Sequence, residues 1–196
     1  MSNNQNAYEP LINGKSAPLS DKLNISLIKQ EDFNEIVKML NTDRVNKYLF
    51  YAPSPPEVFE MFFNPMIEDT KQALSDKKWP NSAGLVIRDS SHNFVGNAGM
   101  SQNPFLSGNY EMGFHLAESS WRKGIATLIA EFITELAFNH LQAYKLSADC
   151  YAQNLGSVKV LEKAGFSQEG CLIDYYNNED DKLIFGITKQ QFSDLL

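Results

Sequence analysis

The chain has 196 residues, of which 43 % are hydrophobic, so it can bury the core of a single domain. Acidic residues outnumber basic ones by 24 to 17, which gives a net charge of −7. The sequence contains no run of basic residues, so recognition of nucleic acid through a basic face is excluded. No apolar run reaches the ~18 residues of a membrane span, and the first twenty residues lack the apolar core of a signal peptide, so we expect a soluble, cytoplasmic protein with no membrane partner.

The chain opens with a polar segment. Residues 1–22 are rich in Ser, Asn and Pro and are predicted to form a flexible N-terminal arm, which leaves residues 23–196 as the single folded domain. Residues 23–28 alternate in part between apolar and polar side chains and predict a first strand. Apolar side chains at helical spacing then predict a helix over residues 30–40.

The least regular part of the sequence lies between residues 41 and 79, where aromatic side chains crowd around three prolines. Because proline interrupts helices but suits their first turn, we expect a short helix, a loop, and then a helix from about Pro56 to Ala73. Most of these aromatic side chains are predicted to lie in the core, with one or two facing a substrate.

The next segment is predicted to be a run of strands. Residues 84–88 and 93–100 flank the polar turn Asp89-Ser-Ser-His92 and therefore predict an antiparallel hairpin. Residues 110–116, rich in aromatic and large apolar side chains, predict the central strand of the sheet.

A long amphipathic helix follows a loop that carries one glycine. Gly124 and Ala126 leave its first turn without bulk, its first N–H groups have no intrahelical partner, and Arg122 and Lys123 add two positive charges. This combination favours an anion site, with phosphate as the expected anion, although an ordinary strand-to-helix turn that needs one glycine would look similar. The apolar stripe of the helix consists of Ile125, Leu128, Ile129, Phe132, Ile133, Leu136 and Ala137.

The last third is predicted to add strands and a second helix to the same sheet. Residues 145–151 predict a strand parallel to residues 110–116, because a right-handed helical crossover joins the two. Asn154 is predicted to cap a helix that Gly165 ends, and a closing hairpin and a last turn of helix should follow. The strands of this hairpin are predicted over residues 168–176 and 182–187, with the turn at residues 177–181, and the final helix is predicted within residues 188–196.

The two cysteines, Cys150 and Cys171, stand in strand-like apolar stretches and in no Cys-x-x-Cys or Cys/His cluster. We therefore predict two reduced thiols and no metal site.

Two segments resemble motifs of the GNAT superfamily, the acyl-CoA-dependent N-acetyltransferases. Trp121-Arg-Lys-Gly124-Ile-Ala126 is similar to the family's pyrophosphate loop, Gln/Arg-x-x-Gly-x-Gly/Ala, except that tryptophan takes the first position, as in the Rim-type branch that acetylates ribosomal-protein N-termini. Asn154-x-x-Ser157…Glu162-Lys-x-Gly-Phe166 resembles the family's second signature.

The resemblance implies an α/β (α+β) GNAT fold. Its centre would be a mixed, mostly antiparallel sheet of about 6–7 strands, flanked by about 4 helices, in which one parallel strand pair splays apart beyond a bulge. Acetyl-CoA would enter that opening as co-substrate. The residues implied in binding it are Phe114, Leu116, Arg122, Lys123, Gly124, Ile125, Ala126, Thr127 and Asn154.

Amine acetylation needs a base for the amine and a proton donor for the departing thiolate. The resemblance places Glu111 as base, directly or through water, and Ser157 as donor, with Tyr151 as its alternative. Glu111 can equally be interpreted as an exposed strand carboxylate without a catalytic role. Asn154 and Ser157 can likewise be interpreted as capping residues alone. His115 is a further candidate for the base, because histidine ordinarily titrates near neutral pH, but a lone histidine in a strand is more often structural.

The acceptor is expected to be a primary amine, with the N-terminal α-amino group of a protein, of the ribosomal-protein type, as first choice. A polyamine, amino acid or antibiotic is the alternative, and a non-catalytic acyl-CoA-binding module is the alternative of another class. A monomer and a homodimer both fit the sequence.

Overall fold

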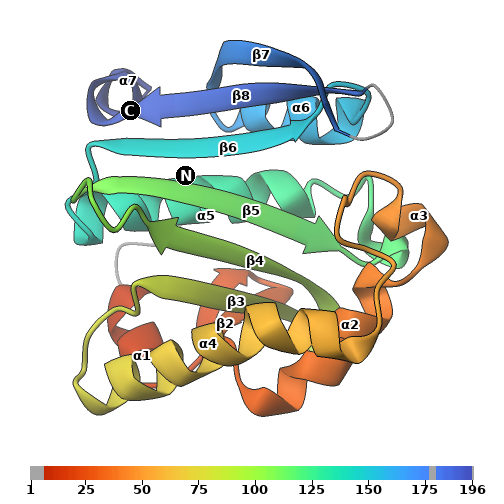
Figure 1. Ribbon diagram of the computed structural model, residues 1–196. Helices are drawn as coiled ribbons and strands as arrows, with labels where there is room; N and C mark the ends of the chain where they lie inside the picture. The colour runs from red at the N-terminus through yellow and green to blue at the C-terminus, as the bar shows by residue number, and fades with distance from the viewer. Residues whose placement is uncertain (1–6, 177–179, 196) are drawn as a thin grey trace.

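The computed structural model describes residues 7–176 and 180–195, which form one mixed sheet with helices on both faces (Figure 1). The strands are β1 (Ala17–Ser20), β2 (Leu23–Leu27), β3 (Ser82–Asp89), β4 (Phe94–Gln102), β5 (Asn109–Leu116), β6 (Lys145–Tyr151), β7 (Ser167–Tyr176) and β8 (Asp180–Thr188). The helices are α1 (Tyr8–Ile12), α2 (Phe33–Leu40), α3 (Asp43–Asn46), α4 (Pro56–Ser75), α5 (Ile125–His140), α6 (Leu155–Lys163) and α7 (Lys189–Asp194), with 3-10 turns η1 (Gln30–Asp32) and η2 (Glu118–Ser120).

The strand order is β1-β2-β3-β4-β5-β6-β8-β7, and each described neighbouring pair is antiparallel except β5–β6. The predicted parallel pair and the closing β7–β8 hairpin are therefore confirmed, although β8 and not β7 lies next to β6. The predicted turn at residues 177–181 falls partly outside the described residues. The sheet has 8 strands where about 6–7 were expected.

The extra strand comes from the N-terminal segment, where the structure differs from the predicted arm. Residues 17–20 form edge strand β1, which pairs with β2, and α1 packs beside it. Leu11 and Ala17 are fully buried in the main core. The packing partners of this polar segment lie far along the chain. Its local composition therefore did not predict that it forms a helix and a strand of the folded domain.

The main core lies between the sheet and α5. The predicted apolar stripe of α5 faces the sheet, with Leu128 at its partly buried edge. Alternate side chains of the central strands point into this core, including Tyr110 and Met112 of β5 and Leu146 and Ala148 of β6. The intervening residues of these strands consequently point to the opposite face.

The opposite face is covered by α2 and α4 only over β3 and its neighbours. Phe33 and Ile36 of α2 and Phe59 and Phe63 of α4 form a second core against Val86. The helix predicted from Pro56 to Ala73 is confirmed and runs two residues further, to Ser75. Over β5 and β6 this face of the sheet is not covered by α2 or α4.

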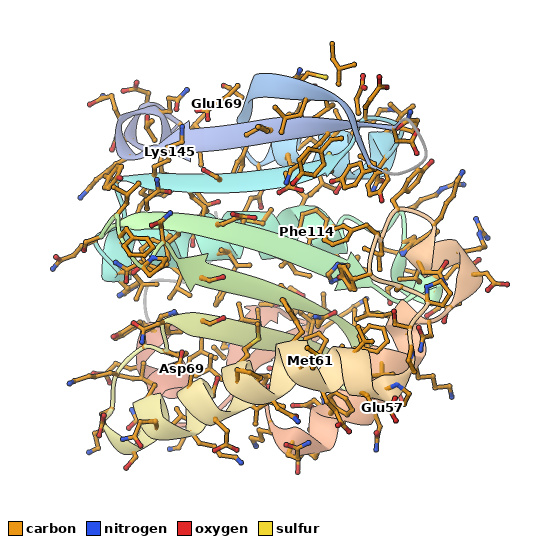
Figure 2. The ribbon with its side chains drawn as sticks, in the orientation of Figure 1. Glu57, Met61, Asp69, Phe114, Lys145 and Glu169 are labelled. Atoms are coloured by element: carbon orange, nitrogen blue, oxygen red, sulfur yellow. The ribbon has the colours of Figure 1, made fainter. Side chains whose placement is uncertain are left out.

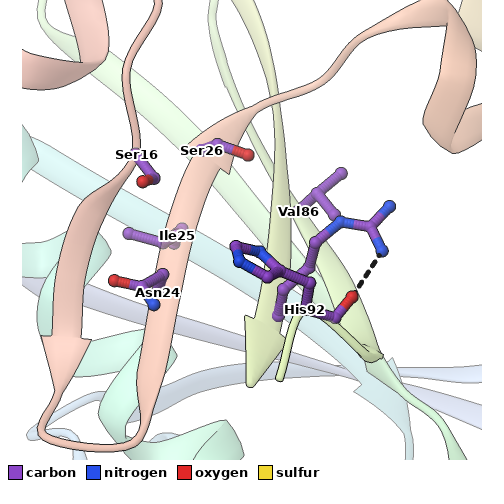
Figure 3. Close-up of a pocket in the computed structure, with 7 residues that line it drawn as sticks. Ser16, Asn24, Ile25, Ser26, Val86 and His92 are labelled. Carbon is purple, nitrogen blue, oxygen red and sulfur yellow. Dashed lines mark hydrogen bonds between the residues drawn. The ribbon is translucent and has the colours of Figure 1, made fainter. Parts of the chain in front are cut away.

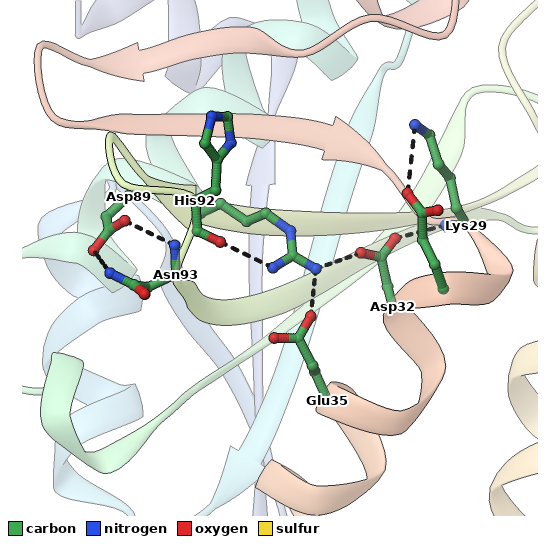
Figure 4. Close-up of polar contacts among 8 residues, drawn as sticks. Lys29, Asp32, Glu35, Asp89, His92 and Asn93 are labelled. Carbon is green, nitrogen blue, oxygen red and sulfur yellow. Dashed lines mark hydrogen bonds and ion pairs between the residues drawn. The ribbon is translucent and has the colours of Figure 1, made fainter.

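Polar contacts fix α2 on β3 (Figure 4). The Arg88 guanidinium on β3 contacts Asp32 at 2.7 Å and Glu35 at 2.5 Å, and its second amino group donates to the His92 carbonyl. Asp32 is buried, and its second oxygen accepts from the Lys29 N–H at 2.8 Å, so the buried carboxylate is fully hydrogen-bonded. These contacts set the position from which residues 41–55 reach over the sheet.

Candidate active site

The two parallel strands at the centre of the sheet form a fork. Register pairs join Asn109 to Lys145, Tyr110 to Leu146 and Glu111 to Ser147, although both strands continue. Figure 1 shows the gap between β5 and β6 widening toward their carboxyl ends. Beyond Glu111 the facing backbone groups of the two strands do not pair with each other and can bind a ligand instead.

The fork opens without the bulge that the family resemblance implied. The β4–β5 register is continuous from Gln102–Tyr110 to Gly96–Leu116, so β5 keeps its regular alternation while it diverges from β6. At the closed end of the fork, the Lys145 ammonium contacts Glu169 at 2.6 Å (Figure 2).

The loop at the open end of the fork has the features of an anion site. Gly124 is the N-cap of α5 at φ 77°, Arg122 also has a left-handed φ of 59°, and a Cβ built on Gly124 would meet no atom within 4 Å. Leu128 N–H makes the first helical bond, to Gly124 O, so the N–H groups of the preceding turn have no intrahelical partner. Arg122 and Lys123 are exposed and form no ion pair with a described residue.

Trp121, the departure from the family motif, holds this loop in place. Its indole N–H donates to the Leu116 carbonyl at 2.8 Å, and the Arg44 guanidinium lies 5.5 Å over its ring. Arg44 also forms an ion pair with Glu118. The segment around α3 is thereby tied to the loop, a link that the sequence did not reveal because these residues are distant in the chain.

The second motif begins α6 as predicted. The Asn154 side chain accepts from the Ser157 N–H at 3.2 Å, so the capping interpretation of Asn154 is confirmed. The Ser157 hydroxyl is half-buried and makes no hydrogen bond to a described residue. It is therefore free to donate to a group beside the first turn of α6.

Glu111 lies where the fork begins, on the uncovered face of the sheet. The residue is exposed at the surface, but partial burial of its carboxyl raises the pKa of that group, with a further increase from Asp149 and a decrease from Lys182. Asp149 and Lys182 themselves form an ion pair at 2.8 Å. A carboxyl whose pKa is raised above its ordinary value is a better base than an ordinary surface glutamate.

Aromatic rings border the wide end of the fork on this face. Tyr151 stacks on Tyr176 with centroids 3.6 Å apart, and burial raises the pKa of both phenols, so both are neutral donors. Phe50, 75 % exposed, contacts Tyr176 on one side and Tyr51 on the other. The rings that join in this contact chain are Tyr48, Phe50, Tyr51, Phe62, Tyr151 and Tyr176.

His115 lies beneath this aromatic border. Its Nε2 is 3.0 Å from the Tyr51 hydroxyl, and burial lowers the pKa of its imidazole to about 4. The imidazole is therefore neutral at physiological pH and a weaker base than an ordinary histidine, which argues for a positioning or binding role and against proton transfer.

Other features of the described chain lie away from the fork. A small cavity at the β2–β3 edge is lined by Asn24, Ser26 and Val86 among others (Figure 3). The described residues hold no cluster of three or more His, Cys, Asp or Glu side chains that could bind a metal. None of the described helices is long and apolar enough to cross a membrane.

Comparison with known proteins places this geometry in a family. The model of the acetyltransferase (GNAT) domain matches residues 22–167. An uncharacterized N-acetyltransferase p20 from Bacillus licheniformis is 22 % identical over 177 residues, covering 89 % of this chain and 97 % of the relative. A putative ribosomal N-acetyltransferase, YdaF, from Bacillus subtilis is 23 % identical, covering 85 % and 91 % of the two chains.

Solved structures show the same fold. A spermidine N-acetyltransferase from Vibrio cholerae in complex with CoA and spermine has a TM-score of 0.75 at 18 % identity, covering 89 % of this chain and 99 % of that one. A GNAT-family acetyltransferase from Bacillus anthracis has a TM-score of 0.73 at 19 % identity, covering 87 % and 97 %. The predicted GNAT fold is confirmed, and the chain belongs to the GNAT family of N-acetyltransferases.

Proposed function

We propose that this enzyme transfers the acetyl group of acetyl-CoA to the N-terminal α-amino group of a protein. The observation that carries the proposal is the position of Glu111 at the last paired residue of the fork, with the cationic loop at residues 122–126 at its open end. From Glu111 to Leu116 the strand spans roughly 16 Å at about 3.3 Å per residue. An extended pantetheine chain lying along this edge would bring the thioester close to the carboxylate.

The cofactor residues have distinct roles in this arrangement. The N–H groups of Ile125, Ala126 and Thr127 and the charges of Arg122 and Lys123 would hold the pyrophosphate, while Gly124 lets it approach the backbone. Phe114 and Leu116 would contribute the free strand edge, and Asn154 would hold α6 beside it. Because the Leu116 side chain is buried in the core, its part would be played by backbone alone.

The reaction forms a nitrogen–carbon bond and breaks the carbon–sulfur bond of the thioester. Glu111, directly or through a water, would take the proton that the amine loses, and Ser157 would donate a proton to the departing thiolate. Tyr151 is the second candidate for the donor, because its phenol is neutral and lies at the end of β6. The product pair is an N-acetylated amine and CoA.

The choice of an α-amine rests on proton affinity. An α-amino group titrates at about 7.7–8.0, whereas a lysine-like alkylamine titrates near 10.4, so far more of the α-amine is free at neutral pH. A single carboxylate base suits the more acidic α-amine, which needs less help to lose its proton. The name of YdaF agrees with a protein acceptor, and the name of the Vibrio cholerae neighbour supports the alternative, a small polyamine.

A panel of amines tests the proposal. Peptides with free N-termini, spermidine, free amino acids and an aminoglycoside would each be mixed with acetyl-CoA, and CoA release would be followed by a thiol reagent. We expect turnover with peptides and loss of that turnover when their N-termini are blocked. Turnover confined to spermidine or another small amine would contradict a protein acceptor and assign the small amine in its place. Absence of turnover with every amine would favour the non-catalytic alternative.

A further inference from the structure

Two buried polar atoms beside the fork have no hydrogen-bond partner among the described residues: Oδ1 of Asn97 and Nδ1 of His115. Asn97 on β4 is 5 % exposed, and its cross-strand partner on β5 is His115, so both side chains leave the sheet on the same face. A buried polar atom without a partner is destabilising, and native proteins satisfy nearly all of them. The two atoms do not bond to each other, so a third group that bonds to both would satisfy them.

Open space adjoins this pair. Gly99 and Gly113 are cross-strand partners that lie two residues from Asn97 and His115 on the same face of β4 and β5. A Cβ on Gly113 would meet no atom within 4 Å, and one on Gly99 would meet only the Ala83 carbonyl at 3.6 Å. We call these two residues the glycine floor.

The glycine floor connects the polar pair to the reacting centre. On its other side lies Glu111, with Ser101 as its cross-strand partner. Toward β3 the floor is closed, because a Cβ on Gly84 would meet Met66 at 2.6 Å and Ile28 at 2.7 Å. An acceptor whose amine reaches Glu111 therefore has a side-chain-free path toward His115, whose Cα lies roughly 13 Å away along the strand.

The chemistry of the pair indicates which group it would hold. When the Tyr51 hydroxyl donates to Nε2 of His115, Nδ1 carries the ring proton and becomes a donor, while Asn97 Oδ1 accepts. A peptide unit offers one N–H donor and one carbonyl acceptor and satisfies both. A second cationic amine has donors only, and the same burial that keeps His115 neutral disfavours another charge there.

We propose that Asn97 and His115, reached across the glycine floor, form a subsite that hydrogen-bonds the fourth peptide group of an extended acceptor, roughly 13 Å from its α-amine. This inference rests on the proposed function and deepens it, because it assigns the enzyme to acceptors that continue from the α-amine as an extended peptide chain. Tyr51 acts as a positioning residue that fixes the imidazole. Acceptors that lack a neutral hydrogen-bonding group at this place, such as simple alkylamines, are disfavoured.

The test pairs a change in the protein with a change in the acceptor. The probes are a peptide with a free N-terminus that the wild type acetylates, and its analogue in which an ester oxygen replaces the fourth amide N–H. For the wild type we expect kcat/KM to be roughly tenfold lower with the ester, the size of one hydrogen bond, mainly through KM. For Asn97→Ala we expect no difference between the two probes.

The matched control is Asn24→Ala, which removes an asparagine from another strand of the same sheet, remote from the fork. It should keep the wild-type discrimination. Gly113→Ala gives a second measurement, because the fold has room for the added methyl group. It should lower kcat/KM for the peptide while the affinity for acetyl-CoA stays unchanged.

The outcomes separate the inference from the proposed function. Equal ester discrimination in the wild type and in Asn97→Ala would overturn the subsite and leave a buried water as the partner of the pair, with the acceptor class intact. If the wild type acetylates spermidine and no peptide, both the α-amine assignment and the subsite are overturned. Discrimination that disappears in Asn97→Ala and persists in Asn24→Ala supports the subsite.

Discussion

Glu111 of β5 and Ser147 of β6 are the last residues that the two parallel strands pair before they separate. The candidate base thus stands at the apex of the fork, on the sheet face that α2 and α4 leave uncovered. The position is set by the fold and not by a local motif: the crossover through α5 makes the strands parallel, and their divergence releases backbone groups immediately beyond the carboxylate.

Acetyl-CoA should stabilise the protein against heat. A ligand that binds only the native state adds RT ln(1 + [L]/Kd), roughly 2.7 kcal/mol at a hundredfold excess over Kd. We therefore expect millimolar acetyl-CoA to raise Tm by several degrees, measured by differential scanning fluorimetry. Adenosine, which lacks the pyrophosphate, should shift Tm much less, and equal shifts from both would place the main contacts outside the loop.

Gly124→Val should abolish tight binding of CoA. The substitution places a β-branched side chain at φ 77° where the pyrophosphate would meet the backbone. Gly14→Val is the matched control, since Gly14 also has a left-handed φ, of 70°, and lies far from the fork. Isothermal titration should show that CoA binding is kept in Gly14→Val and lost in Gly124→Val. Equal affinity for CoA in the two variants would show that the phosphates bind elsewhere.

Ser157→Ala should lower kcat and leave the affinity for CoA nearly unchanged. The hydroxyl makes no hydrogen bond to a described residue, and the backbone N–H that Asn154 caps remains, so the helix is preserved. A lost proton donor typically costs ~10²–10⁴-fold in rate. Tyr151→Phe, which keeps the ring stacked on Tyr176, serves as the comparison. A large rate loss in Tyr151→Phe alone would transfer the donor role to the tyrosine.

Glu111→Gln should remove a pH-dependent destabilisation of the fold. A carboxyl whose pKa is raised in the native state binds its proton more tightly there than in the unfolded chain. The wild type therefore loses stability as pH rises through the ordinary and then the raised pKa, and the variant does not. Chemical denaturation of both proteins between about pH 4 and 8 should show their stabilities diverging in favour of the variant as pH rises.

Much of the scaffold follows from local sequence. The apolar stripe from Ile125 to Ala137 and the capping residue Asn154 predicted α5 and α6, because helix periodicity and caps depend on residues a few positions apart. β6 was predicted with its observed bounds, Lys145–Tyr151, since the strand is bounded by clear breaks. The anion-site features of the loop likewise lie within a single stretch.

What the sequence could not reveal depends on contacts between distant segments. The N-terminal residues around Leu11 and Ala17 look polar and peripheral, yet they join the core through partners far along the chain. The contact of Arg44 with Trp121 joins segments that no local pattern connects. The pairing of Asn97 with His115 depends on strand register, because a shift of one residue would place the two side chains on opposite faces of the sheet. The sequence alone does not give that register.

The role of Glu111 as the base can be measured in the pH–rate profile of Glu111→Gln beside the wild type, with a peptide acceptor and saturating acetyl-CoA. For the wild type, kcat should fall on the acidic side through a pKa above that of an ordinary glutamate. The variant should be ~10²–10⁴-fold slower at neutral pH and lose that limb, with partial recovery as alkaline pH frees the amine. Turnover like that of the wild type in Glu111→Gln would contradict the account and move the proton acceptor to water or to another residue.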